Sequence, residues 1–195
     1  MLIPVVSLAL GLALASATAP AHPRAASSAI APDRGGLEPL VELSLERVRL
    51  ADKVAAAKWG TTLPIDDPAR EKQVLDAVAT QSETLGLNPA VATRIFRDQI
   101  EANKLVQRAL HARWRAHPGG QPAERPDLAT QVRPHLDRIT GELLQAIKDT
   151  GHVRERISCQ TKLTRILTGV ADEEDLGRLH ARGLTRALTS ICRRR

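Results

Sequence analysis

The sequence has few aromatic residues: one Phe, two Trp and no Tyr among 195 residues. Proteins that bind nucleic acids present exposed basic residues interleaved with aromatic residues or glycine. The shortage of aromatic residues therefore argues against nucleic acid as a partner, despite a formal net charge of +6. The positive surplus alone suits acidic lipid or a small polyanion equally well.

Motifs for metal binding and for covalent catalysis are missing as well. The sequence contains no C-x-x-C and no H-E-x-x-H, and its six His are scattered. It also lacks a Gly-rich phosphate-binding loop and a Ser–His–Asp-like arrangement. We therefore predict that the chain binds no metal ion and needs no cofactor.

Charge is absent from residues 2–21, LIPVVSLALGLALASATAPA. The stretch is short for a membrane span and ends in small residues with A-x-A spacing. We interpret residues 1–21 as a signal peptide, cleaved after Ala17 or Ala21, which makes the protein secreted or periplasmic without stable membrane association. An uncleaved anchor is the alternative, because no Lys or Arg precedes the apolar run. Residues 22–36 are predicted to be a disordered linker, which leaves residues 37–195 as one domain.

Only two cysteines are present, Cys159 and Cys192, both in the last quarter of the chain. In an exported protein, an even number of cysteines predicts a disulfide. Closing a loop of this length would stabilise the fold by roughly 3–4 kcal/mol in the chain-entropy picture. Two buried free thiols are the alternative if the signal-peptide interpretation is wrong.

Helical periodicity recurs along the chain between Pro and Gly breaks, and no segment alternates apolar and polar residues over the length of a strand. Asp67 and Asn88 each precede a proline, the pattern of an N-cap followed by proline at the first helical position. Asp172 is a candidate cap for the last helix. We predict an all-α fold, a bundle of about six helices with one C-terminal disulfide. The predicted helices run over residues 38–59, from 67 to the LGLN stretch, and over 88–117, 133–150, 153–168 and 173–192.

Two cations lie on the apolar face of the first predicted helix. On a helical wheel, Leu40, Leu43 and Val54 lie within about 40° of Arg47. Lys58 lies three turns further on, roughly 16 Å along the axis, on the same face. A buried unpaired charge costs several kcal/mol, so each cation needs an anion, unless its long side chain keeps the charged end in water.

The next two predicted helices place further polar groups together. Asp67, Arg70 and Glu71 share one face at the start of the second helix. Asn103 and Gln107 lie one turn apart on the apolar face of the third. Each set has a simpler explanation. The first could be an N-cap with a surface ion pair, and the second could be two amides that bond to each other or to the backbone. Together with the two cations of the first helix, they predict a pocket for a small anion.

The pattern ERVRLADKVAAAKW…LPIDDPAREKQVL…QIEANKLVQ resembles the all-α chorismate mutases. The signal peptide, the additional helices and the late cysteine pair resemble the secreted members, the gamma subclass of the AroQ type. The resemblance covers most of residues 40–192 and is closer in the N-terminal half. It implies conversion of chorismate to prephenate, with chorismate as the small-molecule partner, and it suggests a homodimer.

The resemblance also implies roles for individual side chains. Arg47 and Arg70 would bind substrate carboxylates. Lys58 would face the ether oxygen and a carboxylate, and Gln107 would supply a second donor to the ether oxygen. Lys58, Gln107 and Arg70 are therefore the candidate catalytic residues.

The remaining candidates would complete the substrate pocket. Asp67 and Glu71 would lie near the substrate hydroxyl. Asn103 stands where family members vary among small polar residues. Arg133, at the start of a later predicted helix, would supply one more cation, which would complete the pocket within a single chain.

The implied reaction is a unimolecular rearrangement, which needs no nucleophile, proton transfer or metal and so agrees with the missing motifs. Fixed cations would hold the dianionic substrate in a folded conformation and stabilise the negative charge that develops on the ether oxygen. Two alternatives stay open. One is an isochorismate pyruvate lyase-like activity, whose substrate is nearly the same dianion, and the other is a non-enzymatic secreted helical protein that binds polyanions.

Overall fold

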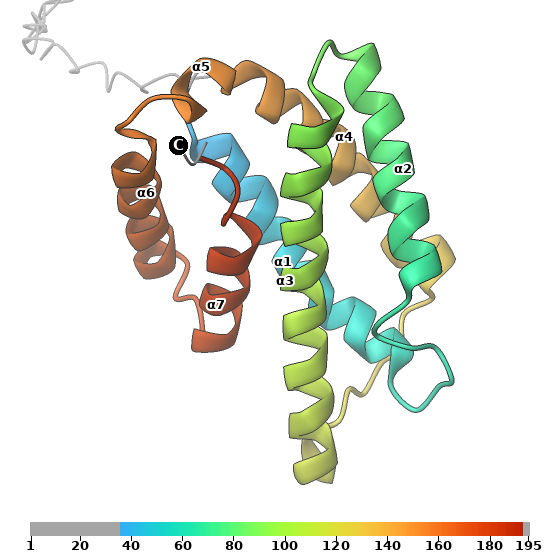
Figure 1. The fold of residues 1–195 in the computed structure, drawn as a ribbon. Coiled ribbons are helices and arrows are strands. Elements are labelled where there is room, and N and C mark those ends of the chain that lie inside the picture. Colours follow the sequence, from blue (N-terminus) through green and yellow to red (C-terminus); the bar gives the residue numbers. More distant parts are fainter. Residues whose placement is uncertain (1–35, 193–195) are drawn as a thin grey trace, which may run out of the picture. The chain divides into compact units, whose positions relative to one another are not determined.

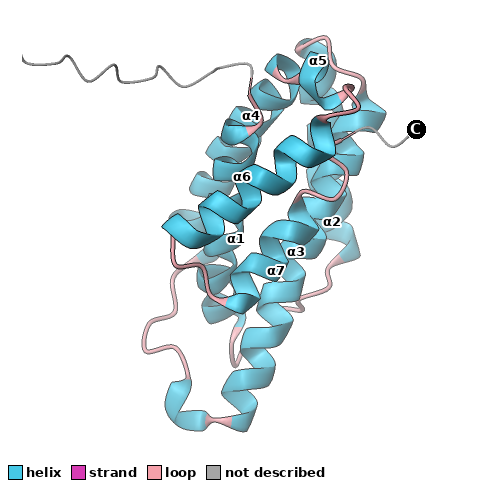
Figure 2. Cartoon of the chain, turned by 90° about the vertical axis from the view of Figure 1, so that its left-hand side faces the viewer, coloured by secondary structure: helices cyan, strands magenta, loops and turns pink. Residues whose placement is uncertain are grey.

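The structure, a computed structural model, describes residues 36–192. This part of the chain consists of helices joined by loops and contains no β-strand (Figures 1 and 2). The prediction of an all-α fold is therefore confirmed. The predicted signal peptide, and the predicted linker up to residue 35, lie outside the described residues.

Seven α-helices follow one another along the described residues, and two short helical turns precede the fourth. The bounds are α1 Glu38–Lys58, α2 Pro68–Thr84, α3 Pro89–Ala116, η1 Pro118–Gly120, η2 Leu128–Val132, α4 Arg133–Asp149, α5 Gly151–Arg154, α6 Cys159–Glu173 and α7 Arg178–Ala187. The turn η1 is a 3-10 turn and η2 is a single π-helical turn. None of these described helices combines the length and apolarity that a membrane crossing requires.

The predicted N-caps of α2 and α3 are confirmed. Asp67 Oδ1 accepts a hydrogen bond from the backbone N–H of Arg70 at 3.0 Å. Asn88 Oδ1 accepts from the backbone N–H of Ala90 at 2.9 Å. In both helices proline follows the cap at the first helical position, where it costs no hydrogen bond. The starts of these helices are therefore determined by local sequence.

Helix α3 is central to the bundle. It packs against α1, α2 and α7, and α1 packs in turn against α4. Figures 1 and 2 show α2 on one side of α3 and α6 and α7 on the other. Gly183 lets α7 approach closely, because a Cβ there would lie 3.0 Å from a methyl of Val106 and 3.1 Å from one of Val48. The core is thus closed by the C-terminal helix against α1 and α3.

The prediction of one helix over 153–168 is wrong. Helix α5 ends at Arg154 and α6 begins only at Cys159. Helix α6 then continues through Gly169 to Glu173, and Val170 in its last turns packs against the core. Burial of this face offsets the cost of a glycine inside a helix, about 1 kcal/mol relative to alanine. The predicted break at Gly169 therefore does not occur.

The last predicted helix, over 173–192, is also shorter than expected. The chain turns at Asp175, which has a φ of 43°, and α7 spans only Arg178–Ala187. Asp172 lies inside α6 and does not cap α7, whose N-cap is Gly177. The sequence marks the turn only weakly, because Asp is an unusual but tolerated residue at positive φ.

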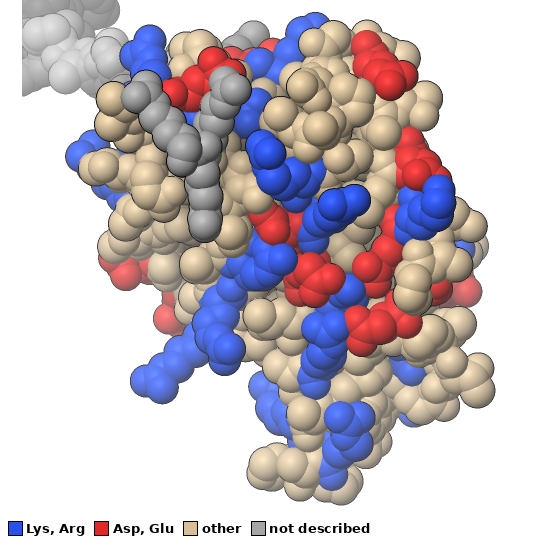
Figure 3. All heavy atoms as spheres, viewed as in Figure 1, with Lys and Arg blue, Asp and Glu red and all other residues tan. Residues whose placement is uncertain are grey.

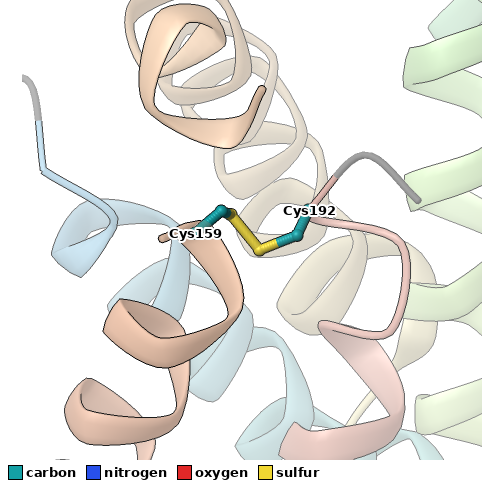
Figure 4. Close-up of a disulfide and its surroundings, with 2 residues drawn as sticks. All are labelled: Cys159 and Cys192. Atoms are coloured by element: carbon teal, nitrogen blue, oxygen red, sulfur yellow. A yellow bond between two sulfur atoms is a disulfide. The ribbon is translucent and has the colours of Figure 1, made fainter. Parts of the chain in front are cut away.

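The predicted disulfide is confirmed. Cys159, at the first turn of α6, is bonded to Cys192, beyond the end of α7, with a Cα–Cα distance of 5.8 Å (Figure 4). Cys159 is almost completely buried. The bond therefore links the start of α6 to the segment that follows α7, at one end of the bundle.

Candidate functional site

A pocket of about 200 Å³ lies between the first four helices. Its lining includes all eight side chains that the sequence marked as candidates for substrate binding or catalysis: Arg47, Lys58, Asp67, Arg70, Glu71, Asn103, Gln107 and Arg133. They come from α1, α2 with its N-cap, α3 and the start of α4. The fold thus brings together residues that lie far apart in the sequence.

Arg47 is buried in the floor of the pocket, with 7% of its surface exposed. Its Nη1 donates hydrogen bonds to the backbone oxygen of Leu136 at 3.4 Å and to Thr140 Oγ1 at 3.3 Å, both on α4. Its Nε has no hydrogen-bond partner among the described residues. Burial lowers the pKa of Arg47 to about 10, and the nearby Asp137 opposes this shift only in part. The charge of Arg47 is therefore neither in water nor balanced by an ion pair.

Lys58 lies at the end of α1, half-buried. Its Nζ donates a hydrogen bond to the backbone oxygen of Pro64 at 2.8 Å. Burial lowers the pKa of Lys58, the acidic side chains around the start of α2 oppose that shift, and Arg133 adds to it. Lys58 and Arg133 line the same pocket, so α1 and α4 each contribute a cation to it.

The start of α2 forms one wall. Asp67 uses one carboxylate oxygen to cap the helix, and Glu71 lies one turn further on. Arg70 is exposed at the pocket edge, where its Nη1 donates a hydrogen bond to Gln73 Oε1 at 3.2 Å. Its guanidinium forms no salt bridge with the described carboxylates, so its charge is available to a ligand.

Asn103 and Gln107 form a hydrogen-bonded pair on α3. Gln107 Nε2 donates to Asn103 Oδ1 at 2.6 Å, and Asn103 Nδ2 donates to the backbone oxygen of Arg47 at 3.3 Å. Gln107 is 3% exposed, and its Oε1 has no partner among the described residues. The simpler explanation for these amides is therefore correct in part, because they bond to each other and to backbone, yet both also line the pocket.

Arg133 is the first residue of α4 and is exposed at the pocket. The π-helical turn η2 precedes it and contributes Leu128 to the lining. The apolar part of the lining is formed by Val54, Leu63, Pro64, Ile65, Val74, Ile100, Leu128 and Leu136. The site therefore combines convergent charged groups with an apolar wall, as ligand pockets commonly do.

Lys104 is a pocket residue that the sequence did not single out. It lies beside Asn103 on α3, and only 8% of its surface is exposed. Its Nζ lies 2.5 Å from Glu101, 2.9 Å from Glu71 and 3.4 Å from Asp66, in each case from a carboxylate oxygen. The available signal was its spacing, since a residue three before Gln107 lies on the same edge of the helix.

The charges that line the pocket do not cancel. Five lining side chains are basic and three are acidic, a net charge of +2. The basic residues are Arg47, Lys58, Arg70, Lys104 and Arg133, and the acidic ones are Asp67, Glu71 and Asp137. The lining contains no Ser, Cys or His, and within the described residues no cluster of His, Cys, Asp and Glu is arranged for a metal ion. The surplus of basic side chains therefore favours an anion as the ligand of this pocket.

Charges on the outer surface are more evenly mixed. In the view of Figure 3, acidic and basic side chains alternate over α2 and the middle of α3. The last turn of α3 is more basic, with Arg113 and Arg115. Basic side chains also follow one another over α7, which contains Arg178, Arg182 and Arg186.

Comparisons of the sequence and of the structure with known proteins all match chorismate mutases. The family described as chorismate mutase type II matches residues 38–108. The secreted chorismate mutase of Mycobacterium tuberculosis is 32% identical over 156 residues, which make up 80% of this chain and 78% of that protein. The secreted chorismate mutase of Mycolicibacterium smegmatis is 32% identical over 165 residues, or 85% of this chain and 91% of that protein. The crystal structure of a chorismate mutase from Burkholderia phymatum has a TM-score of 0.77 and 36% identity, and covers 83% of this chain and 98% of that one.

Proposed function

The chain belongs to the secreted chorismate mutases of type II, and we propose that the pocket between its first four helices is where it converts chorismate to prephenate. One observation carries this proposal: Arg47 is buried and has no ion-pair partner among residues 36–192, in a pocket whose lining has a net charge of +2. Chorismate has two carboxylates, so it supplies the opposite charge. Its binding leaves a neutral complex and pairs a buried cation that is otherwise costly.

Three arginines hold the substrate carboxylates. Arg47 does so from the pocket floor, and Arg70 and Arg133 from its edges on α2 and α4. Arginine suits this task because its planar guanidinium can donate two parallel hydrogen bonds to one carboxylate. Binding both ends of chorismate at fixed points keeps the molecule folded, which removes most of the entropic barrier to an intramolecular reaction.

Lys58 and Gln107 stabilise the transition state. As the carbon–oxygen bond of chorismate breaks, negative charge develops on the ether oxygen. A cation and an amide donor held in place stabilise that charge more than they stabilise the ground state. Each donor of this kind contributes about 3–4 kcal/mol to catalysis.

The other polar residues of the lining bind the substrate hydroxyl or hold the catalytic side chains in place. One oxygen of Asp67 caps α2 and one oxygen of Glu71 accepts from Lys104, so each carboxylate retains an oxygen for the substrate hydroxyl. Asn103 lies between Arg47 and Gln107 and bonds to both. All these side chains belong to one chain, so the homodimer that the family resemblance suggests is not needed to complete the pocket.

Purified protein incubated with chorismate tests the activity directly. Loss of chorismate together with stoichiometric appearance of prephenate is expected, without added metal or cofactor. Release of pyruvate from isochorismate, with no prephenate from chorismate, would favour the lyase instead. Absence of both, with binding to heparin, would leave the polyanion-binding alternative.

We also propose that the protein is exported. Its matched relatives from both mycobacteria are secreted proteins, and the Cys159–Cys192 disulfide is typical of oxidising compartments. We expect the signal peptide to be removed on export, by cleavage after Ala17 or after Ala21. The intact mass of protein recovered from the periplasm or medium decides this and distinguishes cleavage after Ala17 from cleavage after Ala21.

A further inference from the structure

The carboxylate of Glu71 presents a difficulty for a pocket that binds a dianion. Glu71 lines the pocket from α2, close to the arginines proposed to hold the substrate. In a partly buried site, two like charges repel strongly because little water screens them. Unless Glu71 is neutralised, it opposes the binding that the proposed function requires.

Lys104 forms an ion pair with Glu71. Its Nζ donates a hydrogen bond to Glu71 Oε1 at 2.9 Å, and the lysine side chain is nine-tenths buried. Burial alone would lower the pKa of Lys104, but the carboxylates of Glu101 and Glu71 outweigh it and raise that pKa. The ammonium therefore keeps its charge, with its hydrogens directed to carboxylates rather than to the pocket interior.

We infer that Lys104 is a positioning residue, which holds Glu71 in place and cancels its charge so that the pocket accepts a doubly negative substrate. The inference rests on the proposed function, because it concerns the binding of chorismate. With Lys104 the lining carries +2, which matches the dianion, and without it the lining would carry +1. A weaker positive field lowers affinity for chorismate but leaves the groups at the ether oxygen unchanged.

A purely structural role has to be distinguished from this one. Lys104 also lies 3.4 Å from Asp66, in the segment between α1 and α2, and could serve only to hold that segment. Arg108, one turn further along α3, binds the same Asp66 through its Nε at 3.3 Å but does not line the pocket. Arg108→Met is therefore a matched control that removes a contact to this segment and leaves the pocket lining unchanged.

The test compares steady-state kinetics on chorismate for the wild-type protein, Lys104→Met, Lys104→Met/Glu71→Gln and Arg108→Met. For Lys104→Met we expect KM to rise roughly ten- to a hundredfold, the effect of one unit charge in a partly buried site. We expect kcat to stay within about threefold, because Lys104 does not touch the reacting atoms. Gln at position 71 carries no charge but keeps an oxygen that can accept from the substrate hydroxyl. The double variant again has a lining of +2, so its KM should fall well below that of Lys104→Met. The KM of Arg108→Met should stay near the wild-type value.

The KM of the double variant is the decisive readout, because removing the charge of Glu71 does not restore the contacts of Lys104 with Asp66 and Glu101. If wild-type protein turns over chorismate, the inference is overturned by an unchanged KM in Lys104→Met or by a double variant as impaired as the single one. Absence of turnover in the wild type would instead refute the proposed function. Lys104→Gln removes the charge but keeps a hydrogen bond, and it should give the same KM increase. It replaces Lys104→Met in the test if circular dichroism shows Lys104→Met to be unfolded.

Discussion

Gln107 donates its Nε2 to Asn103 Oδ1 at 2.6 Å, and this contact determines which end of the Gln107 amide is the donor. Asn103 itself donates to the backbone carbonyl of Arg47 at 3.3 Å. A carbonyl can only accept, so Asn103 has to present its oxygen to Gln107. One hydrogen of Gln107 Nε2 is thereby committed, and the second remains for a ligand in the pocket.

Gln107→Glu makes turnover dependent on pH. An amide donates at every pH, so kcat of the wild-type protein should stay level from mildly acidic pH to about pH 8. A carboxyl donates only while protonated and has one hydrogen where the amide has two. The variant should therefore lose activity as pH rises toward neutral, and it should be slower than wild type even at acidic pH. Initial rates at saturating chorismate across this range test the prediction, and a level profile in the variant would remove Gln107 from the ether-oxygen role.

Lys58→Ala and Arg70→Ala should each remove almost all turnover. Each change removes a cation that contacts the substrate in the proposed complex, a loss of two to three orders of magnitude for one such donor. Neither side chain belongs to the core, since Lys58 is half-buried and Arg70 is exposed. Helical circular dichroism should therefore be retained.

The matched control for these two variants is Lys72→Ala. Lys72 is exposed on α2 and pairs with Asp76, four residues on, outside the pocket. Its removal should leave kcat/KM unchanged. Near-normal kcat/KM in either Lys58→Ala or Arg70→Ala would show that the pocket is assigned wrongly.

The first three helices and most of the site could be predicted because their signals are local. A cap followed by proline determines where α2 and α3 begin. Arg47 and Gln107 stood out because a polar residue on an apolar helical face needs a partner. The spacing within each helix then put these groups on faces that pack against one another.

The remaining features depend on contacts between distant segments. Lys104 has Glu101 three residues before it and so resembles an ordinary surface pair in the sequence. Only the packing of α2 against α3 brings Glu71 to it and buries it. The end of α6 was mistaken for the same reason, because Val170 is held by the core beyond a glycine that would end an isolated helix.

Reduction of the Cys159–Cys192 bond should lower stability without changing catalysis. In the chain-entropy picture, the lost crosslink costs roughly 3–4 kcal/mol of unfolding free energy. Neither cysteine lines the pocket, so kcat/KM should stay unchanged while the protein is folded. Urea unfolding with and without reductant measures the difference, and a Cys159→Ser/Cys192→Ser variant should be insensitive to reductant. Coincident unfolding curves for oxidised and reduced wild type would contradict the prediction.

Arg47→Met should make the ligand-free protein more stable while removing its activity. Burial lowers the pKa of Arg47 to about 10, so the fold disfavours the charged form. Because this pKa lies below that of the unfolded chain, the cost is fully present at neutral pH and is relieved only as pH rises through about 10. Methionine removes this cost, and even buried ion pairs, whose charges are partly compensated, can be replaced by apolar side chains with a gain of about 1–4 kcal/mol.

The loss of Arg47 leaves no unpaired group behind on α4, because the backbone oxygen of Leu136 also accepts from Thr140 at 2.7 Å. Chemical denaturation in the absence and presence of prephenate, which carries the same two charges as chorismate, tests both halves of the prediction. Prephenate should stabilise the wild type by mass action and leave Arg47→Met unaffected. A variant that is less stable than wild type, or that prephenate still stabilises, would show that the charge of Arg47 serves the fold rather than the substrate.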